Sequence, residues 1–109
     1  MEPKTARSAD IIAIPIATGS WRKTVAWGER TLLSEVTFEK GGVVPRHSHP
    51  HEQTGYVVSG AIEFTLGDRV IVVRAGDGYL IPGDVAHGCL ALEPSVAIDV
   101  FSPIREEYK

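Results

Sequence analysis

The chain contains a single cysteine, Cys89, so no internal disulfide bond can form and nothing requires an oxidising compartment. It also lacks an apolar run of about 20 residues, which is the length a helix needs to cross a bilayer. The first twenty residues have no signal-peptide pattern, because Glu2, Asp10 and Pro15 interrupt the apolar residues there. These absences predict a cytoplasmic protein that does not associate with a membrane.

Basic residues are in short supply as well, since 11 Lys and Arg against 14 Asp and Glu give a net charge of -3. Such a chain has no positive field to attract nucleic acid. A length of 109 residues leaves room for one compact core, so we expect a single domain over residues 1–109. Any activity must therefore use one pocket or one surface.

What the chain has instead is a series of short apolar segments separated by turn residues. Segments rich in β-branched, aromatic or aliphatic residues occur at 32–38, 55–58, 61–66, 70–73, 79–81 and 96–101. Clusters of glycine, proline and aspartate lie between them and favour sharp corners. No amphipathic helix is evident, and residues 103–108 have room for one helical turn at most. The pattern predicts an all-β barrel or sandwich.

Three of the four histidines lie in a pattern suited to metal binding. His47 and His49 are two positions apart, so on an extended strand they project from one face and can reach the same ion. Neutral imidazole is a common ligand for divalent zinc, nickel, iron or manganese. The pair alone also fits two ordinary surface or core histidines, so the surrounding sequence has to decide between these interpretations.

Two glycine-framed blocks surround these histidines. Residues 41–60 have the form G-x5-H-x-H-x3-Q-x6-G, and residues 76–87 have the form G-x5-P-x4-H. Together they resemble the paired motifs of the cupin superfamily. This resemblance implies a double-stranded β-helix, which is a jelly-roll barrel, with one divalent metal ion (Zn, Ni, Fe or Mn) held by His47, His49, Gln53 and His87. Glutamine stands where glutamate is commoner, and its neutral carbonyl would leave the metal a stronger Lewis acid.

Other polar residues in these blocks have simpler interpretations. We expect His51 to lie at the rim of the site, because Pro50 interrupts a regular strand and the cupin pattern skips this position. Asp77 lies in a glycine-containing turn, where a bond from its side chain to the local backbone is the usual role. Cys89 is expected to be a small buried apolar residue rather than a ligand.

A second informative stretch, residues 98–106, places Asp99 inside an apolar strand. A buried carboxylate must be paired, solvated by a cavity or shifted in pKa, because isolated charge is costly to bury. Phe101 shares its face, and Arg105 follows closely enough to present a planar guanidinium to a substrate carboxylate. The alternative is an exposed Asp99–Arg105 ion pair on the surface, which would contribute little to stability.

The ending D-x-F-x-P-x-R-E at residues 99–106, together with H-S-H-P-H-E-Q at 47–53, resembles the small single-domain cupins of the KdgF family. The resemblance runs from about Gly41 to Lys109, and we assign no chemistry to the first forty residues. It implies conversion of 4,5-unsaturated monouronates, released from pectin or alginate, to linear keto forms. It also implies a homodimer.

The chemistry suggested by this resemblance gives each residue a role. The metal would orient and polarise sugar oxygens, and Asp99 would act as general acid and base. Arg105 would bind the uronate carboxylate and take part in catalysis, and Phe101 would form the pocket wall that contacts the substrate. Two alternatives are a cupin-type metal-dependent dioxygenase and a non-enzymatic module that binds a small molecule. A barrel with a purely structural role ranks last.

Overall fold

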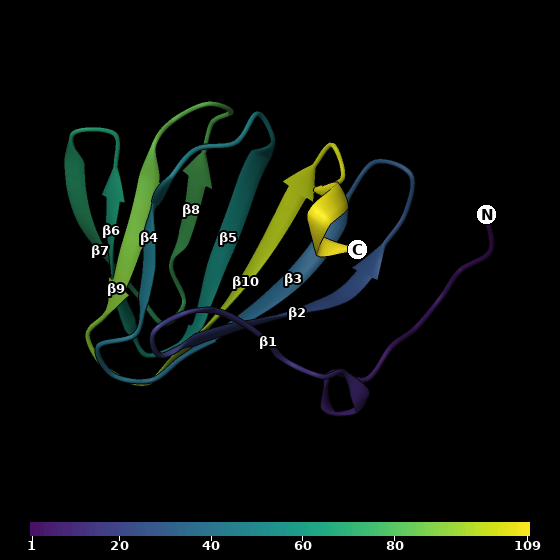
Figure 1. The fold of residues 1–109 in the computed structure, drawn as a ribbon, viewed down its shortest axis with the longest axis horizontal. Helices are drawn as coiled ribbons and strands as arrows, with labels where there is room; N and C mark the ends of the chain where they lie inside the picture. The colour runs from purple at the N-terminus through teal and green to yellow at the C-terminus, as the bar shows by residue number, and fades with distance from the viewer.

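The computed structural model describes residues 1–109 and contains ten strands (Figure 1). Their bounds are β1 Ile14–Ala17, β2 Ser20–Trp27, β3 Leu32–Phe38, β4 Val43–His47, β5 Glu52–Ser59, β6 Ala61–Leu66, β7 Arg69–Arg74, β8 Gly78–Ile81, β9 His87–Ala91 and β10 Ser95–Ser102. Two single-turn 3-10 helices, η1 (Ser8–Asp10) and η2 (Glu106–Tyr108), complete the elements. The second of these agrees with the single helical turn expected near the C-terminus.

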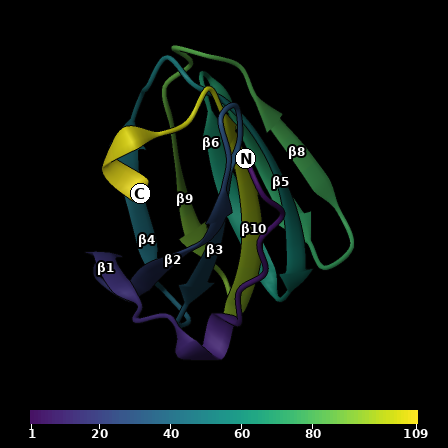
Figure 2. The same ribbon diagram turned by 90° about the vertical axis from the view of Figure 1, so that its right-hand side faces the viewer.

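The strands form two antiparallel sheets that face each other (Figure 2). One sheet has six strands in the order β1-β2-β3-β10-β5-β8, and the other has four in the order β4-β9-β6-β7. The chain crosses between the sheets after β3, β4, β5, β7, β8 and β9, which closes them into a jelly-roll barrel. The predicted all-β barrel is confirmed. None of the helical segments has the length and apolar character needed to span a membrane.

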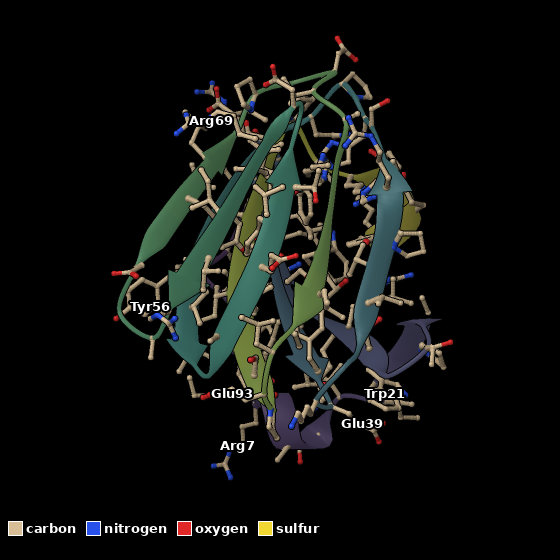
Figure 3. All side chains as sticks on the ribbon, turned by 90° about the vertical axis from the view of Figure 1, so that its left-hand side faces the viewer. Arg7, Trp21, Glu39, Tyr56, Arg69 and Glu93 are labelled. Carbon is tan, nitrogen blue, oxygen red and sulfur yellow. The ribbon has the colours of Figure 1, made fainter.

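The barrel interior follows from strict alternation along its central strands. On β3 and β10 every second residue is buried, and the residues between them are only partly covered or exposed. Side chains from the two sheets fill the space between them (Figure 3). The buried apolar ones form a cluster towards one end of the barrel, here called the core end. Its buried members are Val36, Phe38, Val57, Ile62, Phe64, Val73, Ala91 and Ala97. Burial of each larger side chain stabilises the fold by about 1.5–3 kcal/mol.

The same strands carry polar residues at the opposite end, here called the site end. Connections 48–51 and 82–86 lie there, at the top of the barrel in Figure 1, together with the C-terminal turn. Inward positions at this end hold His87 on β9, Gln53 on β5 and Asp99 on β10, all buried. Along each of these strands the inward-facing side chains therefore change from apolar to polar, while the alternation of inward-facing and outward-facing residues continues.

Candidate metal centre and its cavity

Four predicted ligand residues come together from three strands and one connection. His47 ends β4 and is paired in register with His87 at the start of β9, while Gln53 lies on β5. The potential ligand nitrogens of His47, His49 and His87 all lie within 4.8 Å of one another. This cluster is compatible with one bound metal ion, as the histidine pattern predicts.

His49 differs from the expectation that it continues the same strand as His47. Strand β4 ends at His47, and His49 lies in the following connection. Its position is fixed by the backbone, because the Asp84 N–H donates to the His49 carbonyl oxygen at 2.8 Å. Gly83 makes this approach possible, since a Cβ there would overlap the carbonyl oxygen of Pro50. The turn at 82–84 therefore holds the connection that carries His49.

The histidine rings present their Nε2 atoms to the centre. Nδ1 of His47 and of His87 each lies 2.8 Å from a backbone carbonyl oxygen, and Nδ1 of His49 lies 3.1 Å from another. Carbonyl oxygens only accept, so each Nδ1 carries the proton and each Nε2 carries the lone pair that a metal requires. Burial lowers the pKa of His87 to about 4 and also lowers that of His49, which keeps both rings neutral.

Gln53 completes the donor set. Its Oε1 lies 3.1 Å from His49 Nε2. With the His49 proton on Nδ1, these two atoms both present lone pairs, and a cation bound by both would satisfy them. Three imidazole nitrogens and one amide oxygen suit a divalent transition metal, and several such ions accept this set. The residues present therefore fit the metal that the cupin resemblance implies.

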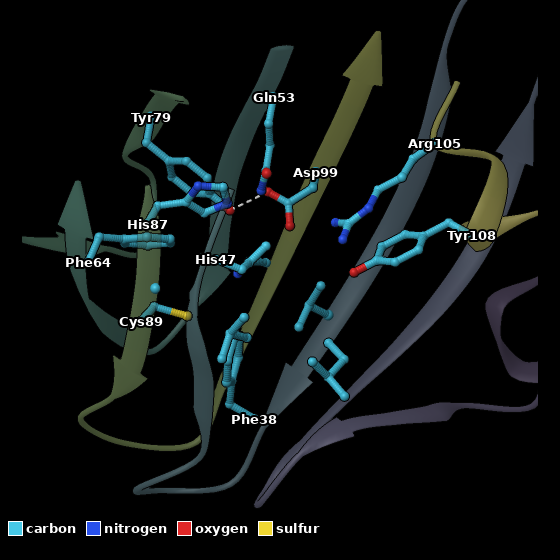
Figure 4. Close-up of a pocket in the computed structure, with 15 residues that line it drawn as sticks. Phe38, His47, Gln53, Phe64, Tyr79, His87, Cys89, Asp99, Arg105 and Tyr108 are labelled. Atoms are coloured by element: carbon cyan, nitrogen blue, oxygen red, sulfur yellow. Dashed lines mark hydrogen bonds between the residues drawn. The ribbon is translucent and has the colours of Figure 1, made fainter. Parts of the chain in front are cut away.

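Two of the three histidines, His47 and His87, line a cavity together with Gln53, and its volume is about 490 Å³ with the solvent at its open mouth included (Figure 4). Asp99 and Arg105 line the same cavity, so the structure brings the predicted acid and cation to the metal cluster. Phe101 does not line it. Its ring, 2% exposed, lies behind the lining and packs edge-on against His49 at a centroid distance of 5.6 Å. The expectation that Phe101 forms the cavity surface is corrected accordingly, because neighbouring rings cover it.

Asp99 is buried and points inward, with 6% of its surface exposed. The Tyr79 hydroxyl donates to Asp99 Oδ1 at 2.5 Å (dashed line in Figure 4). Burial raises the pKa of Asp99, while hydrogen bonds from Tyr79 and Gln53 and the charge of Arg105 oppose this rise. The alternative of an exposed Asp99–Arg105 surface pair is therefore wrong.

Arg105 pairs with a different acid. Its Nε donates to Glu107 Oε1 at 2.6 Å, and this hydrogen bond lowers the pKa of Glu107. The guanidinium carbon also lies 4.1 Å from the centroid of the Tyr108 ring, and the guanidinium carbon of Arg22 lies 4.0 Å from the same centroid. With its Nε edge occupied and its face stacked, Arg105 keeps its terminal nitrogens for the cavity (Figure 4).

The sequence pattern did not single out Tyr79, Glu107 or Tyr108. Tyr79 occupies a predicted strand, where a tyrosine next to glycine gives no signal of a polar contact. Glu107 and Tyr108 lie just past the D-x-F-x-P-x-R-E motif, and no periodic pattern there marks them as partners of Arg105. Their contacts depend on how η2 folds back over β10, where Phe101 and Tyr108 rings meet at 5.4 Å.

The simpler interpretations of nearby residues agree with the structure. Cys89 lines the cavity as a neutral thiol, since burial raises its pKa to about 12. Asp77 Oδ2 accepts a hydrogen bond from the Arg74 N–H at 3.1 Å, which closes the turn it was assigned to. The His51 ring lies 5.4 Å from that of His49, and its buried Nδ1 has no hydrogen-bond partner.

Comparisons with known proteins agree with this geometry. A family model described as "Cupin domain" matches residues 34–101. The pectin degradation protein KdgF of Dickeya dadantii (strain 3937) is 33% identical over 95 residues, which cover 85% of this chain and 86% of that protein. The solved structure of KdgF from Halomonas sp. is 34% identical with a TM-score of 0.92, covering 99% and 100% of the two chains. An RmlC-like cupin from Shewanella frigidimarina NCIMB 400 is 27% identical with a TM-score of 0.91, covering 99% and 97%.

The cupin match spans more than half of the chain, and the barrel with its histidine cluster has the corresponding architecture, so the protein belongs to the cupin family. Within that family it belongs to the KdgF group, because its similarity to the Dickeya and Halomonas proteins extends over most of each chain. Both parts of the resemblance inferred from the sequence are confirmed.

Proposed function

We propose that this protein is an enzyme that converts 4,5-unsaturated monouronates to linear ketonised sugar acids with the help of a divalent metal. The observation that carries the proposal is that three groups line one cavity: a histidine of the metal cluster (His47), the buried carboxyl group of Asp99 and the guanidinium of Arg105. Only the Nε of this guanidinium is paired with an acid. Similarity to a pectin degradation protein supports this choice of substrate class.

The reaction moves one proton from oxygen to carbon. In the cyclic substrate the hydroxyl at C1 loses its proton and the bond between C1 and the ring oxygen breaks, which leaves an aldehyde at C1 and an enol or enolate at C5. Protonation at C4 then gives the ketone, so the overall change is an isomerisation. A base must accept the first proton and an acid must deliver the second.

Asp99 suits this transfer. It is buried beside the cavity, its pKa is raised by burial, and hydrogen bonds from neighbouring side chains fix the carboxyl group. Such a group can accept a proton from the C1 hydroxyl and deliver it to C4. A divalent metal held by the three histidines and Gln53 supplies Lewis-acid polarisation of bound oxygen atoms.

Arg105 suits the uronate carboxylate. Its terminal nitrogens face the cavity, and a planar guanidinium can form two parallel hydrogen bonds with a carboxylate. The net charge of -3 repels an anionic substrate at long range, which makes one local cation more valuable. Phe101 would act indirectly, by holding the His49 ring from behind.

Three finer features of the proposal come from the sequence alone. They are a substrate derived from pectin or from alginate, a homodimer, and a cytoplasmic location. Unsaturated uronates prepared separately with pectin and alginate lyases would distinguish the sources. Sedimentation or light scattering would measure the oligomeric state.

The direct test is to incubate metal-loaded protein with lyase-generated unsaturated monouronate and follow the loss of ultraviolet absorbance from its conjugated double bond. We expect loss well above the spontaneous rate, and no acceleration by metal-stripped protein. Absence of any acceleration would remove this function. A dioxygenase, the alternative enzyme, would instead consume oxygen. The cavity favours the first proposal, because Asp99 and Arg105 together suit a sugar acid better than an apolar aromatic substrate.

A further inference from the structure

Tyr79, Gly55 and Asp99 lie side by side across three neighbouring strands. Gly55 on β5 is paired in register with Tyr79 on β8 and with Asp99 on β10. Strands are spaced by about 4.8 Å, so residues two strands apart have backbones roughly 10 Å from each other. A hydrogen bond between Tyr79 and Asp99 is therefore possible only if the tyrosine ring crosses over the middle strand.

Gly55 is what permits this crossing. A Cβ at position 55 would overlap the Cζ, Cε2 and hydroxyl oxygen of Tyr79. The tyrosine ring thus lies directly against the backbone of β5, in the space that any other side chain would fill. On its other side the ring packs against Phe64 at a centroid distance of 4.4 Å. The ring is held on two sides and has little freedom to swing away.

The hydroxyl at the end of this ring is a donor to Asp99. Burial and the neighbouring Asp99 charge raise the pKa of Tyr79 well above its usual range, so the hydroxyl keeps its proton. On the opposite side of Asp99, Ser34 occupies the paired position on β3, and its buried Oγ has no hydrogen-bond partner. The carboxyl group therefore has a hydroxyl donor on its β8 side and none on its β3 side.

We propose that Tyr79 is a positioning residue, which holds the Asp99 carboxyl group for proton transfer. Gly55 is required because only a residue without a Cβ leaves room for the Tyr79 ring to cross β5. This inference rests on the proposed function for its kinetic test. Tyr79 fixes Oδ1 through its hydroxyl, and the other face of the carboxyl group stays turned to the cavity that it lines. Orientation of this kind lowers the barrier, since small displacements of a catalytic group are costly.

The first test is Tyr79→Phe, which keeps the ring against Phe64 and removes only the hydroxyl. We expect kcat to fall by about 10–100-fold, as a misplaced catalytic group would cause. KM should change less than about twofold and metal content should be unchanged, because the hydroxyl contacts Asp99 and not the histidines. A kcat within twofold of wild type would overturn the proposal, and so would a loss confined to KM.

Two matched controls accompany this variant. Ser34→Ala removes a hydroxyl at the other register neighbour of Asp99, and Tyr56→Phe removes one from the exposed face of β5. Both should keep the wild-type kcat. If Ser34→Ala lowered kcat as much as Tyr79→Phe does, loss of either hydroxyl beside Asp99 would have the same effect. That result would contradict a specific role for Tyr79.

The role of Gly55 is tested by Gly55→Ala and by the double variant with Tyr79→Phe. The added methyl displaces the ring, so the single change should lower kcat about as much as Tyr79→Phe does. Both changes disrupt the same hydrogen bond, between Tyr79 and Asp99. The kcat of the double variant should therefore be no lower than that of either single variant. Independent, multiplying losses would refute the coupling. Should Gly55→Ala not fold, Tyr79→Phe alone decides the proposal.

A measurement without substrate separates this inference from the proposed function. In zinc-loaded protein labelled with 13C at aspartate carboxyl groups, the Asp99 resonance is identified as the one missing from Asp99→Asn. It should shift in Tyr79→Phe and stay unchanged in Tyr56→Phe. An inactive wild type with this shift refutes the function and supports the contact, whereas an active wild type with no shift refutes the contact alone.

Discussion

The two ends of the barrel use the same strands for opposite purposes. On β10, Ala97 belongs to the core cluster and borders the cavity, and Asp99, two residues on, brings a carboxyl group to that cavity. On β5, Val57 and Gln53 divide in the same way. Because the alternation is unbroken, one backbone supplies both a stabilising layer and a reactive one.

The difference shows where stability and chemistry are separated. Apolar burial at the core end favours folding, whereas the site end buries imidazoles and a carboxyl group and partly covers the Arg105 guanidinium, which folding alone would disfavour. Substitutions at the site end should therefore affect turnover much more than stability, and those at the core end should do the reverse.

The largest effect is expected for His87→Ala at the site end. Loss of one imidazole should remove stoichiometric metal and lower turnover by about 1,000-fold or more, because Lewis-acid stabilisation contributes several kcal/mol. Elemental analysis and kcat measure this. His51→Gln, outside the donor set, should keep its metal. A His87→Ala protein with one tightly bound ion per chain would show that the cluster is not the ligand set.

Asp99→Asn should keep the metal and lose most activity. The expected fall in kcat is about 100–10,000-fold, the usual contribution of a general acid or base. Removing the ionisable group should leave the unfolding free energy unchanged or higher, since burial disfavours the charge. Kinetics and urea unfolding of one preparation give both values. Full turnover of the unsaturated uronate would contradict the assignment of Asp99.

Ile62→Ala is the corresponding change at the core end. Ile62 is 0% exposed and lies in the core cluster, so its truncation should lower the unfolding free energy by about 2–5 kcal/mol. Below the unfolding transition kcat should be within about twofold of wild type. Val70→Ala on neighbouring β7, where the side chain is 64% exposed, is the control and should change stability by less than about 0.5 kcal/mol. A large loss of kcat in folded Ile62→Ala would break the contrast.

The smallest effect is on the pH dependence of stability. The pKa of His87 is about 4 in the folded chain and 6.5 ordinarily, so the unfolded chain takes up the proton first. Stability of metal-free protein should fall as pH drops from 6.5 towards 4, by less than about 3 kcal/mol, because the ring lines the open cavity and solvent screens its charge. The raised pKa of Asp99 acts in the opposite sense, since its contribution is lost as pH rises. Urea unfolding should show a shallower dependence in His87→Asn, and identical slopes would contradict this origin.

The fold was predictable because turn residues and short apolar strands are local signals. All six predicted segments lie within observed strands, and 32–38 and 61–66 match their strands completely. Strands β1, β2, β4 and β9 were missed. In β2 the central Arg22 and Lys23 are both partly buried, so no alternation of polar and apolar residues marks this strand.

The metal cluster was predictable because the motif spacing reflects the register of the barrel. The surroundings of Asp99 were not, since Tyr79 reaches it across β5 through a space left by Gly55. The ion pair between Arg105 and Glu107 was not predictable either, because the position of Glu107 depends on the conformation of η2 and not on strand geometry. Contacts that cross strands or follow an irregular turn leave no periodic signal in the sequence.

The hydrogen bond from the Asp84 N–H to the His49 carbonyl oxygen has a consequence for how such a protein can diverge. It joins the connection that carries His49 to the connection that precedes His87 through main-chain atoms alone, so exchange of most side chains in these two connections leaves it in place. Gly83 is one exception, because a side chain there would push Pro50 away, and Asp84 is another, because its φ of 66° disfavours most other residues. The ion-binding geometry can thus be inherited almost independently of the residues that choose the substrate, which makes the barrel a durable platform for new specificities.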